Sequence, residues 1–231
     1  MNIKEFIRAE LNGWGKYERY IFPLGIIFII CLSFYLKDSK IALISAICGI
    51  SYTILAGKGK ISCYLFGLTG TMCYAYLAYK NGLWGNLCLY MLYYFPMQIV
   101  GIFQWKKHLK KETQEIIKTQ LNTKEKIFYT VLAIIFSILA GVVLQILKDP
   151  TPYIDGTATT LSVIGLILTI KRCIEQWYIW TIVNALSAIM WIVAYINGSN
   201  CFATILMWLT YLTLGLYFLH TWKEEIECQE V

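Results

Sequence analysis

The chain has 231 residues, of which 58% are hydrophobic, 16% aromatic and only 15% charged, and its formal net charge is +6. A soluble domain of this length carries roughly 25% charged residues, and its apolar residues do not form long uninterrupted runs as they do here. The composition excludes an ordinary soluble domain and indicates a polytopic membrane protein. The eight cysteines form no C-x-x-C pair and lie mostly inside apolar runs, so they predict packing residues rather than disulfides or a metal site.

The first twenty residues are polar and of mixed charge. They lack the apolar core and small-residue cleavage site of a signal peptide. We expect a short amphipathic helix on the membrane surface instead.

Eight apolar runs follow as candidate membrane-spanning helices, although the first and sixth are short for a span. They cover residues 21–36, 41–57, 61–79, 83–105, 127–147, 157–169, 177–196 and 200–220. Barrel strands would alternate over about ten residues, so long apolar runs predict an all-α membrane protein.

The basic residues predict the orientation of these spans. With eight spans, 16 of the 20 lysines and arginines fall on the side that carries both termini. Positive charge is retained in the cytoplasm, so both termini are expected to be cytoplasmic. The basic linker 106–126 is then a solvated or lipid-headgroup-facing cytoplasmic segment rather than a nucleic-acid site.

The sequence also repeats. AYKNGLW at 78–84 matches AYINGSN at 194–200, and QWKKH at 104–108 matches TWKEE at 221–225. These matches predict one extra helix followed by a 3+1+3 parallel repeat, a layout found among transporters. The chain is expected to divide into a surface segment with the extra helix (1–40), the first three-helix bundle (41–108), a linker with the connecting helix (109–150), and the second bundle with the C-terminal tail (151–231).

The run 83–105 contains no charged residue but carries Tyr94, Pro96 and Gln98 near its middle. Pro96 removes one helical hydrogen bond, so the helix is expected to kink or open there. An amide beside an opened turn is typical of a recognition surface, and Asn86 is a further candidate. The alternative is a structural role, in which Gln98 donates a hydrogen bond to the backbone carbonyl that Pro96 leaves without a donor.

A second group of candidates follows helical spacing in the run 177–196. Trp177, Trp180, Asn184, Ser187 and Trp191 step by three and four residues, which predicts one helical face. Indole rings interleaved with an amide and a hydroxyl suit a flat heterocycle attached to a sugar. The alternatives are an interfacial aromatic belt for the tryptophans and an interhelical hydrogen bond for Asn184. The small residues Gly67 and Gly70 are expected to serve helix packing.

The predicted spans contain no aspartate or glutamate, and neither histidine lies deep within one. A proton-coupled pump normally needs such a relay, so passive movement of a solute is favoured over coupled transport, and an intramembrane enzyme is disfavoured. The same scarcity of ligands predicts neither a metal nor a cofactor.

With these residues in place, the chain resembles the PnuC family of bacterial vitamin transporters, in particular the nicotinamide riboside branch. The matching segments are WGNLCLYMLYYFPMQIVGIFQWKKH at 84–108 and DGTATTLSVIGLILTIKRCIEQWYIWTIVNALSAIMW at 155–191. The resemblance implies a multi-pass protein of the bacterial inner membrane with a fold like that of the SWEET sugar transporters, and a substrate held between two three-helix bundles. It assigns binding roles to Gln98, Trp177, Trp180 and Asn184.

The same resemblance implies uptake of nicotinamide riboside by facilitated diffusion, with trapping by a cytoplasmic nucleoside kinase that feeds NAD synthesis. Transport of thiamine or another vitamin is the nearest alternative, and a membrane receptor or assembly subunit whose linker docks a partner is a second. The lipid bilayer is the expected environment, nucleic acid is not an expected partner, and a homo-oligomer is compatible with the sequence.

Overall fold

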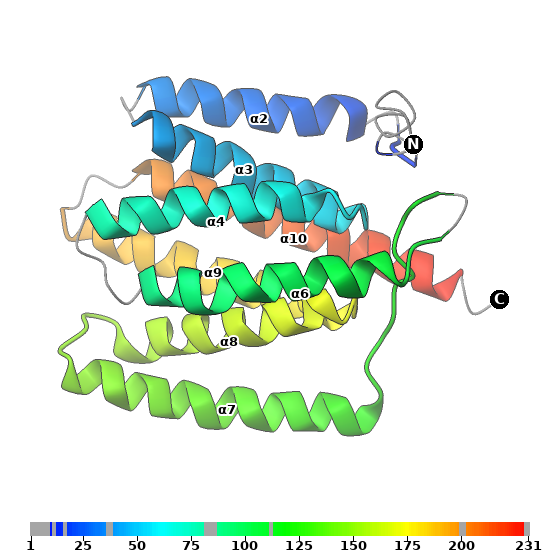
Figure 1. Ribbon diagram of the computed structural model, residues 1–231. Coiled ribbons are helices and arrows are strands. Elements are labelled where there is room, and N and C mark those ends of the chain that lie inside the picture. Colours follow the sequence, from blue (N-terminus) through cyan, green and yellow to red (C-terminus); the bar gives the residue numbers. More distant parts are fainter. Residues whose placement is uncertain are drawn as a thin grey trace. The chain divides into compact units, whose positions relative to one another are not determined.

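Figure 1 shows the computed structural model of the chain, which describes residues 10, 13–15, 18–35, 39–80, 87–110, 113–198 and 202–228. The described residues form helices, with isolated bridges but no strand between them. They divide into two compact units, Met1–Ile117 (unit 1) and Lys118–Val231 (unit 2).

Six of the described helices are long and apolar enough to cross a membrane, two in unit 1 and four in unit 2. They are Glu18–Tyr35, Lys40–Gly57, Thr123–Ile146, Pro152–Ile170 and two stretches of the last two helices, Glu175–Val193 and Thr204–Glu227. A membrane-spanning helix needs about 20 predominantly apolar residues, which these segments approach or exceed.

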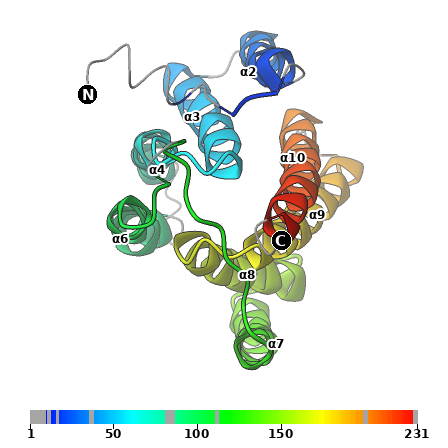
Figure 2. The ribbon, with the colours of Figure 1, turned by 90° about the vertical axis from the view of Figure 1, so that its right-hand side faces the viewer.

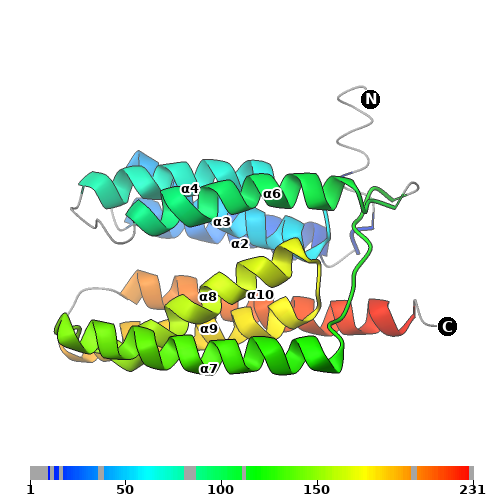
Figure 3. The same ribbon diagram turned by 60° about the horizontal axis from the view of Figure 1, so that its bottom comes forward.

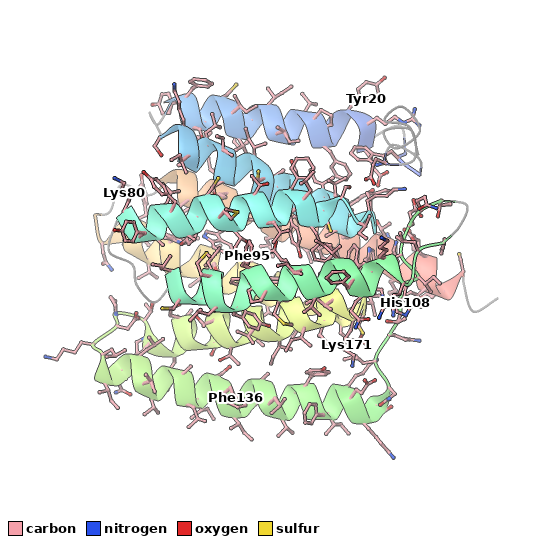
Figure 4. The ribbon with its side chains drawn as sticks, in the orientation of Figure 1. Tyr20, Lys80, Phe95, His108, Phe136 and Lys171 are labelled. Carbon is pink, nitrogen blue, oxygen red and sulfur yellow. The ribbon has the colours of Figure 1, made fainter. Side chains whose placement is uncertain are left out.

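Unit 1 contains helices α2 (Glu18–Tyr35), α3 (Lys40–Gly57), α4 (Cys63–Lys80) and α6 (Phe95–Lys106), with the π-helical segment η1 (Leu89–Tyr94) before α6. Viewed end-on, α4 lies between α3 and α6 (Figure 2). Lys80 and His108 lie at opposite ends of this unit (Figure 4).

The helix around Pro96 opens one turn before the proline, as expected. In η1 the Phe95 N–H donates to the carbonyl of Tyr90, five residues earlier, instead of the usual four. Proline has no N–H and its ring crowds the preceding turn, so a wider π-type turn accommodates it. The side chains of Leu89–Tyr94 are thereby turned relative to those of α6.

Unit 2 contains α7 (Thr123–Ile146), α8 (Pro152–Ile170), α9 (Glu175–Ile196) and α10 (Phe202–Glu227). Each packs on the next along the chain, and α8 runs obliquely to α7 (Figure 3). The predicted run 157–169 is too short, because α8 already begins at Pro152. Proline fits the first helical turn, and Asp155 beside the helix N-terminus is favourable although it interrupts the apolar pattern.

Helix α7 is the most exposed of the long helices. It contacts α8, and only Gly141 is fully buried along its length. Its outward side chains are apolar, and Phe136, labelled in Figure 4, is 52% exposed. Gly141 permits the close contact, because a Cβ there would lie 2.4 Å from the Tyr153 ring of α8. An exposed apolar helix of this kind is suited to contact with lipid.

Two turns in the different units share one hydrogen-bond pattern. After α3, the N–H groups of Lys58 and Gly59 donate to the carbonyls of Ile54 and Ala56. After α8, Lys171 and Arg172, each 113 positions later, donate in the same way to Ile167 and Thr169. Gly59 and Arg172 also share a left-handed backbone, with φ of 67° and 63°. Only glycine adopts this conformation without cost, so Arg172 carries some strain.

The linker after α6 is not simply solvated, which corrects the sequence-based expectation. Ile116, Lys118 and Leu121 are all buried. In unit 1 the Ile116 N–H donates to the Gly59 carbonyl at 3.0 Å, and in unit 2 the Thr119 N–H donates to the Arg172 carbonyl at 3.0 Å. The apolar side chains and these backbone hydrogen bonds attach the segment to the turns.

Ion pairs reinforce this end of each unit. In unit 1 they are Lys58–Glu18 at 3.0 Å and Lys60–Glu115 at 3.2 Å. In unit 2 they are Lys118–Glu225, Lys126–Glu175 and Lys171–Glu125. The hydrogen bond to Glu125 raises the pKa of the Lys171 ammonium group. The sequence predicts that all of these lysines are cytoplasmic. Within each unit, they lie together at one end of the helices.

Candidate functional site

Gln98 lies on α6 inside unit 1 and is only 5% exposed. Its Nε2 donates to Thr71 Oγ1 on α4 at 2.7 Å, whereas its Oε1 is buried without a hydrogen-bond partner among the described residues. The backbone of Gly67 leaves room for this oxygen, since a Cβ there would lie 2.7 Å from it. An unpaired buried acceptor costs about 1–3 kcal/mol, and lipid offers no compensation.

Two tyrosines adjoin this amide. Tyr52 on α3 and Tyr64 on α4 have ring centroids 6.3 Å apart, and both hydroxyl groups are buried without a hydrogen-bond partner in the described part of the chain. The Tyr64 ring packs edge-on against Trp105 at 5.0 Å and touches Gly101, where a Cβ would lie 2.4 Å from the hydroxyl oxygen. These residues form a tightly packed polar interior.

Tyr94, a predicted binding residue, ends the π-helical segment and is half-buried. It makes edge contacts with Tyr90 at 4.9 Å and Tyr93 at 5.5 Å, and Tyr90 stacks on Tyr74 of α4 at 4.2 Å. The opened turn therefore presents an aromatic cluster rather than isolated rings. Asn86 lies outside the described residues.

The tryptophans of α9 do not all face the same neighbour, although their spacing predicts one face. Trp177 is buried against α10, with its ring 5.2 Å from Phe218 and 5.8 Å from Trp222. Trp180 turns toward α8, and its Nε1 donates to Thr169 Oγ1 at 3.1 Å. The face divides because α9 packs between α8 and α10.

The amide and hydroxyl of α9 lie within unit 2. Asn184 is 7% exposed. It lies beside Gly215 of α10, where a Cβ would be 3.6 Å from Asn184 Nδ2. Ser187 is equally buried, while Trp191 is 37% exposed nearer the end of the helix. A buried amide, which can both donate and accept hydrogen bonds, is suited to recognising a polar solute.

Sequence reasoning missed several residues that surround these side chains. They are Tyr52, Tyr64 and Thr71 in unit 1, and Thr169 and Gly215 in unit 2. Each is defined by a contact with another helix, so no spacing within one helix marks it. The glycines were a usable signal, because Gly67 and Gly70 were predicted to serve helix packing. A Cβ added to Gly70 would lie 3.2 Å from the Cβ of Cys48, so Gly70 does pack closely on α3.

A family model described as "Nicotinamide mononucleotide transporter" matches residues 39–224, and it covers both groups of candidates. The chain belongs to this family, which is that of the PnuC vitamin transporters. Its sequence is 31% identical to the nicotinamide riboside transporter PnuC of Neisseria mucosa over 98% of this chain and 88% of the relative. It is also 31% identical to PnuC of Haemophilus influenzae, over 94% of both chains.

A solved structure agrees with this membership. The crystal structure of the vitamin B3 transporter PnuC matches with a TM-score of 0.83 and 28% sequence identity, over 98% of this chain and 99% of the other. The chain is thus an all-helical, multi-pass protein of the inner membrane, as PnuC transporters are. These PnuC relatives are transporters and not enzymes.

Proposed function

We propose that the chain imports nicotinamide riboside by facilitated diffusion. Phosphorylation by a cytoplasmic nucleoside kinase then traps the solute and supplies NAD synthesis. The observation that carries the proposal is the alignment with nicotinamide riboside transporters over nearly the whole chain at 31% identity. Buried amide and indole groups in both units are consistent with a neutral or cationic heterocycle joined to a sugar.

Gln98 and Asn184 are the residues that we expect to bind the solute most directly. Each is an amide buried within its helical bundle, and Gln98 Oε1 has no hydrogen-bond partner among the described residues. Trp180, Ser187, Trp191 and Tyr94 are further candidates, while Trp177, packed on Phe218 and Trp222, is expected to support the site from within the bundle.

The distribution of charge supports a passive mechanism. Among the described residues, the acidic groups lie at helix ends or between helices: Glu18 and Glu125 are in first turns, and Asp155 is in the first turn of α8. A proton relay through the bilayer centre normally needs an acid or a histidine there. Transport independent of proton and sodium gradients is therefore expected.

The architecture that we propose is a duplicated three-helix bundle with one connecting helix and one extra N-terminal helix, both termini being cytoplasmic. The equal hydrogen bonding of the turns after α3 and α8, 113 positions apart, supports the duplication. Edge contacts of Tyr64 with Trp105 and of Trp177 with Trp222 support it further. The basic, ion-paired ends of both units support the orientation.

Uptake of labelled nicotinamide riboside into proteoliposomes tests the proposal. Equal uptake with and without imposed gradients is expected, and uptake that appears only with a gradient would refute facilitated diffusion. Competition by excess unlabelled thiamine is expected to be weak; strong competition would favour the thiamine alternative.

The binding residues are tested with Gln98→Ala and Asn184→Ala. Loss of one hydrogen bond to the solute is expected to weaken binding by about tenfold, with expression unchanged. Gln104→Ala is the matched control, because Gln104 is an exposed glutamine on the same helix as Gln98. Unchanged affinity in both test variants would assign these amides to helix packing.

A further inference from the structure

Three unpaired polar atoms in unit 1 come from three different helices. They are the Tyr52 hydroxyl on α3, the Tyr64 hydroxyl on α4 and Gln98 Oε1 on α6, all buried without a hydrogen-bond partner among the described residues. Buried polar groups are nearly always paired, so each unpaired group calls for an explanation. In the same unit, hydroxyls of Thr53 and Thr69 do find backbone carbonyls, at 3.1 and 2.9 Å.

The three groups belong to one interior. The Tyr52 and Tyr64 ring centroids are 6.3 Å apart. The position of a Cβ on Gly67 is 2.7 Å from Gln98 Oε1 and 2.8 Å from the Tyr52 ring, so the two side chains meet over this glycine. One turn further along α6, the absence of a side chain at Gly101 leaves room for the Tyr64 hydroxyl, because a Cβ there would lie 2.4 Å from its oxygen. Figure 2 shows α3 and α6 on either side of α4.

Thr71 determines the chemical character of this interior. Its Oγ1 accepts the hydrogen bond from Gln98 Nε2 at 2.7 Å, which leaves the acceptor end of the amide toward Gly67. A carbonyl oxygen beside two hydroxyl groups suits a neutral hydrogen-bond donor, such as a carboxamide N–H or a hydroxyl. It does not suit a carboxylate, which would place negative charge beside the carbonyl oxygen in a medium that cannot solvate it.

We propose that Gln98 Oε1 and the hydroxyls of Tyr52 and Tyr64 form a subsite in unit 1 that receives a neutral hydrogen-bond-donating group of the transported solute. The inference rests on the proposed function and adds both tyrosines to the binding residues. The three atoms are closed to solvent in this conformation, so the side chains move apart when the group enters.

Thermal unfolding of Tyr52→Phe and Tyr64→Phe in detergent gives a readout that separates binding from structure. Removal of an unpaired hydroxyl leaves the Tm of the ligand-free protein equal or higher, because a buried unsatisfied group is eliminated. The rise in Tm on adding nicotinamide riboside becomes smaller than in the wild type. Tyr76→Phe, which alters an exposed tyrosine on α4, changes neither quantity.

A purely structural role gives the opposite pattern: a lower Tm without ligand and an unchanged response to nicotinamide riboside. That result would overturn the proposal. A wild-type protein that does not respond to nicotinamide riboside would refute the proposed function instead, while the ligand-free Tm of the two variants still reports whether the hydroxyls are unpaired.

Analogues identify which group of the solute enters the subsite. Nicotinic acid riboside replaces the carboxamide by a carboxylate, and deoxyribose analogues remove one hydroxyl each. The wild type is expected to bind one of these classes about tenfold or more weakly than nicotinamide riboside, and the Phe variants are expected to lose that discrimination. Full discrimination in both variants would show that the tyrosine hydroxyls take no part.

Discussion

Replacing Gly101 by alanine tests how tightly α4 and α6 pack around the candidate residues. A Cβ at position 101 would lie 2.4 Å from both Cζ and the hydroxyl oxygen of Tyr64, and 2.5 Å from Cε1. Real Cβ atoms essentially never make contacts shorter than 3.0 Å. In this conformation the Tyr64 ring is fully buried and its centroid lies 5.0 Å from that of Trp105, so a Cβ at position 101 has to displace a packed ring.

Two opposing effects determine the size of the change. Alanine is favoured over glycine within a helix by about 1 kcal/mol. Overpacking of a rigid interior costs about 1–3 kcal/mol, and here the contact is with a ring rather than with the end of a flexible chain. The difference between the two effects leads us to expect that Gly101→Ala lowers stability by up to about 2 kcal/mol, which corresponds to a Tm up to about 8 °C lower for a protein of this size.

Thermal unfolding in detergent measures this change, and Gly25→Ala on α2 is the matched control. No atom lies within 4 Å of a Cβ at position 25, so that variant is expected to be neutral or slightly more stable. In a Tyr64→Leu background, which lacks the three contacted atoms, Gly101→Ala should cost about 1 kcal/mol less. Equal Tm values for Gly101→Ala and Gly25→Ala would refute the reasoning.

Two further predictions concern the linker and the start of α7. Lys118→Met removes the ion pair between the buried Lys118 and the partly exposed Glu225, and a cation–π contact 4.9 Å from the Trp222 ring centroid, so we expect a loss of about 1–3 kcal/mol in thermal unfolding. The exposed Lys124→Met is its control, and a similar effect of both would contradict a docked linker. Asn122→Ala removes the side-chain oxygen that accepts from the Glu125 N–H in the capping box of α7, and is expected to cost about 1 kcal/mol. Asn122→Asp keeps this acceptor and is expected to retain most of the stability. Equal losses in the two variants would argue against the cap.

Much of the helical framework could be predicted because it depends on local pattern. The runs 41–57 and 61–79 agree with α3 and α4 within two residues. Pro96 predicted an opened turn because a proline acts on the turn directly before it. The ends of α8 and α10 were less predictable, since charged residues such as Asp155 and Glu224 interrupt the apolar pattern without ending the helix.

The contacts between helices could not be read from spacing. A step of three or four residues places Trp177 and Trp180 on similar faces of α9, but neighbours on both sides divide that face between α10 and α8. The linker likewise has a solvated composition, and its burial depends on carbonyls of turns far away in sequence, those of Gly59 and Arg172. Such partners are determined by tertiary packing.

The two amides illustrate the same principle under the proposed duplication. When α6 and α10, the last helices of the two units, are aligned at an offset of 117, Gly215 stands opposite Gln98. This alignment alone suggests that the second copy has lost an amide. The offset of 113 that superposes the turns after α3 and α8 sets Asn184 against Thr71. In unit 1, Gln98 on α6 bonds to Thr71 on α4, and in unit 2, Asn184 on α9 lies beside Gly215 on α10. Each unit therefore keeps one amide at the corresponding helix contact but carries it on the opposite helix, so the asymmetry of the sequence is an exchange of positions rather than a loss.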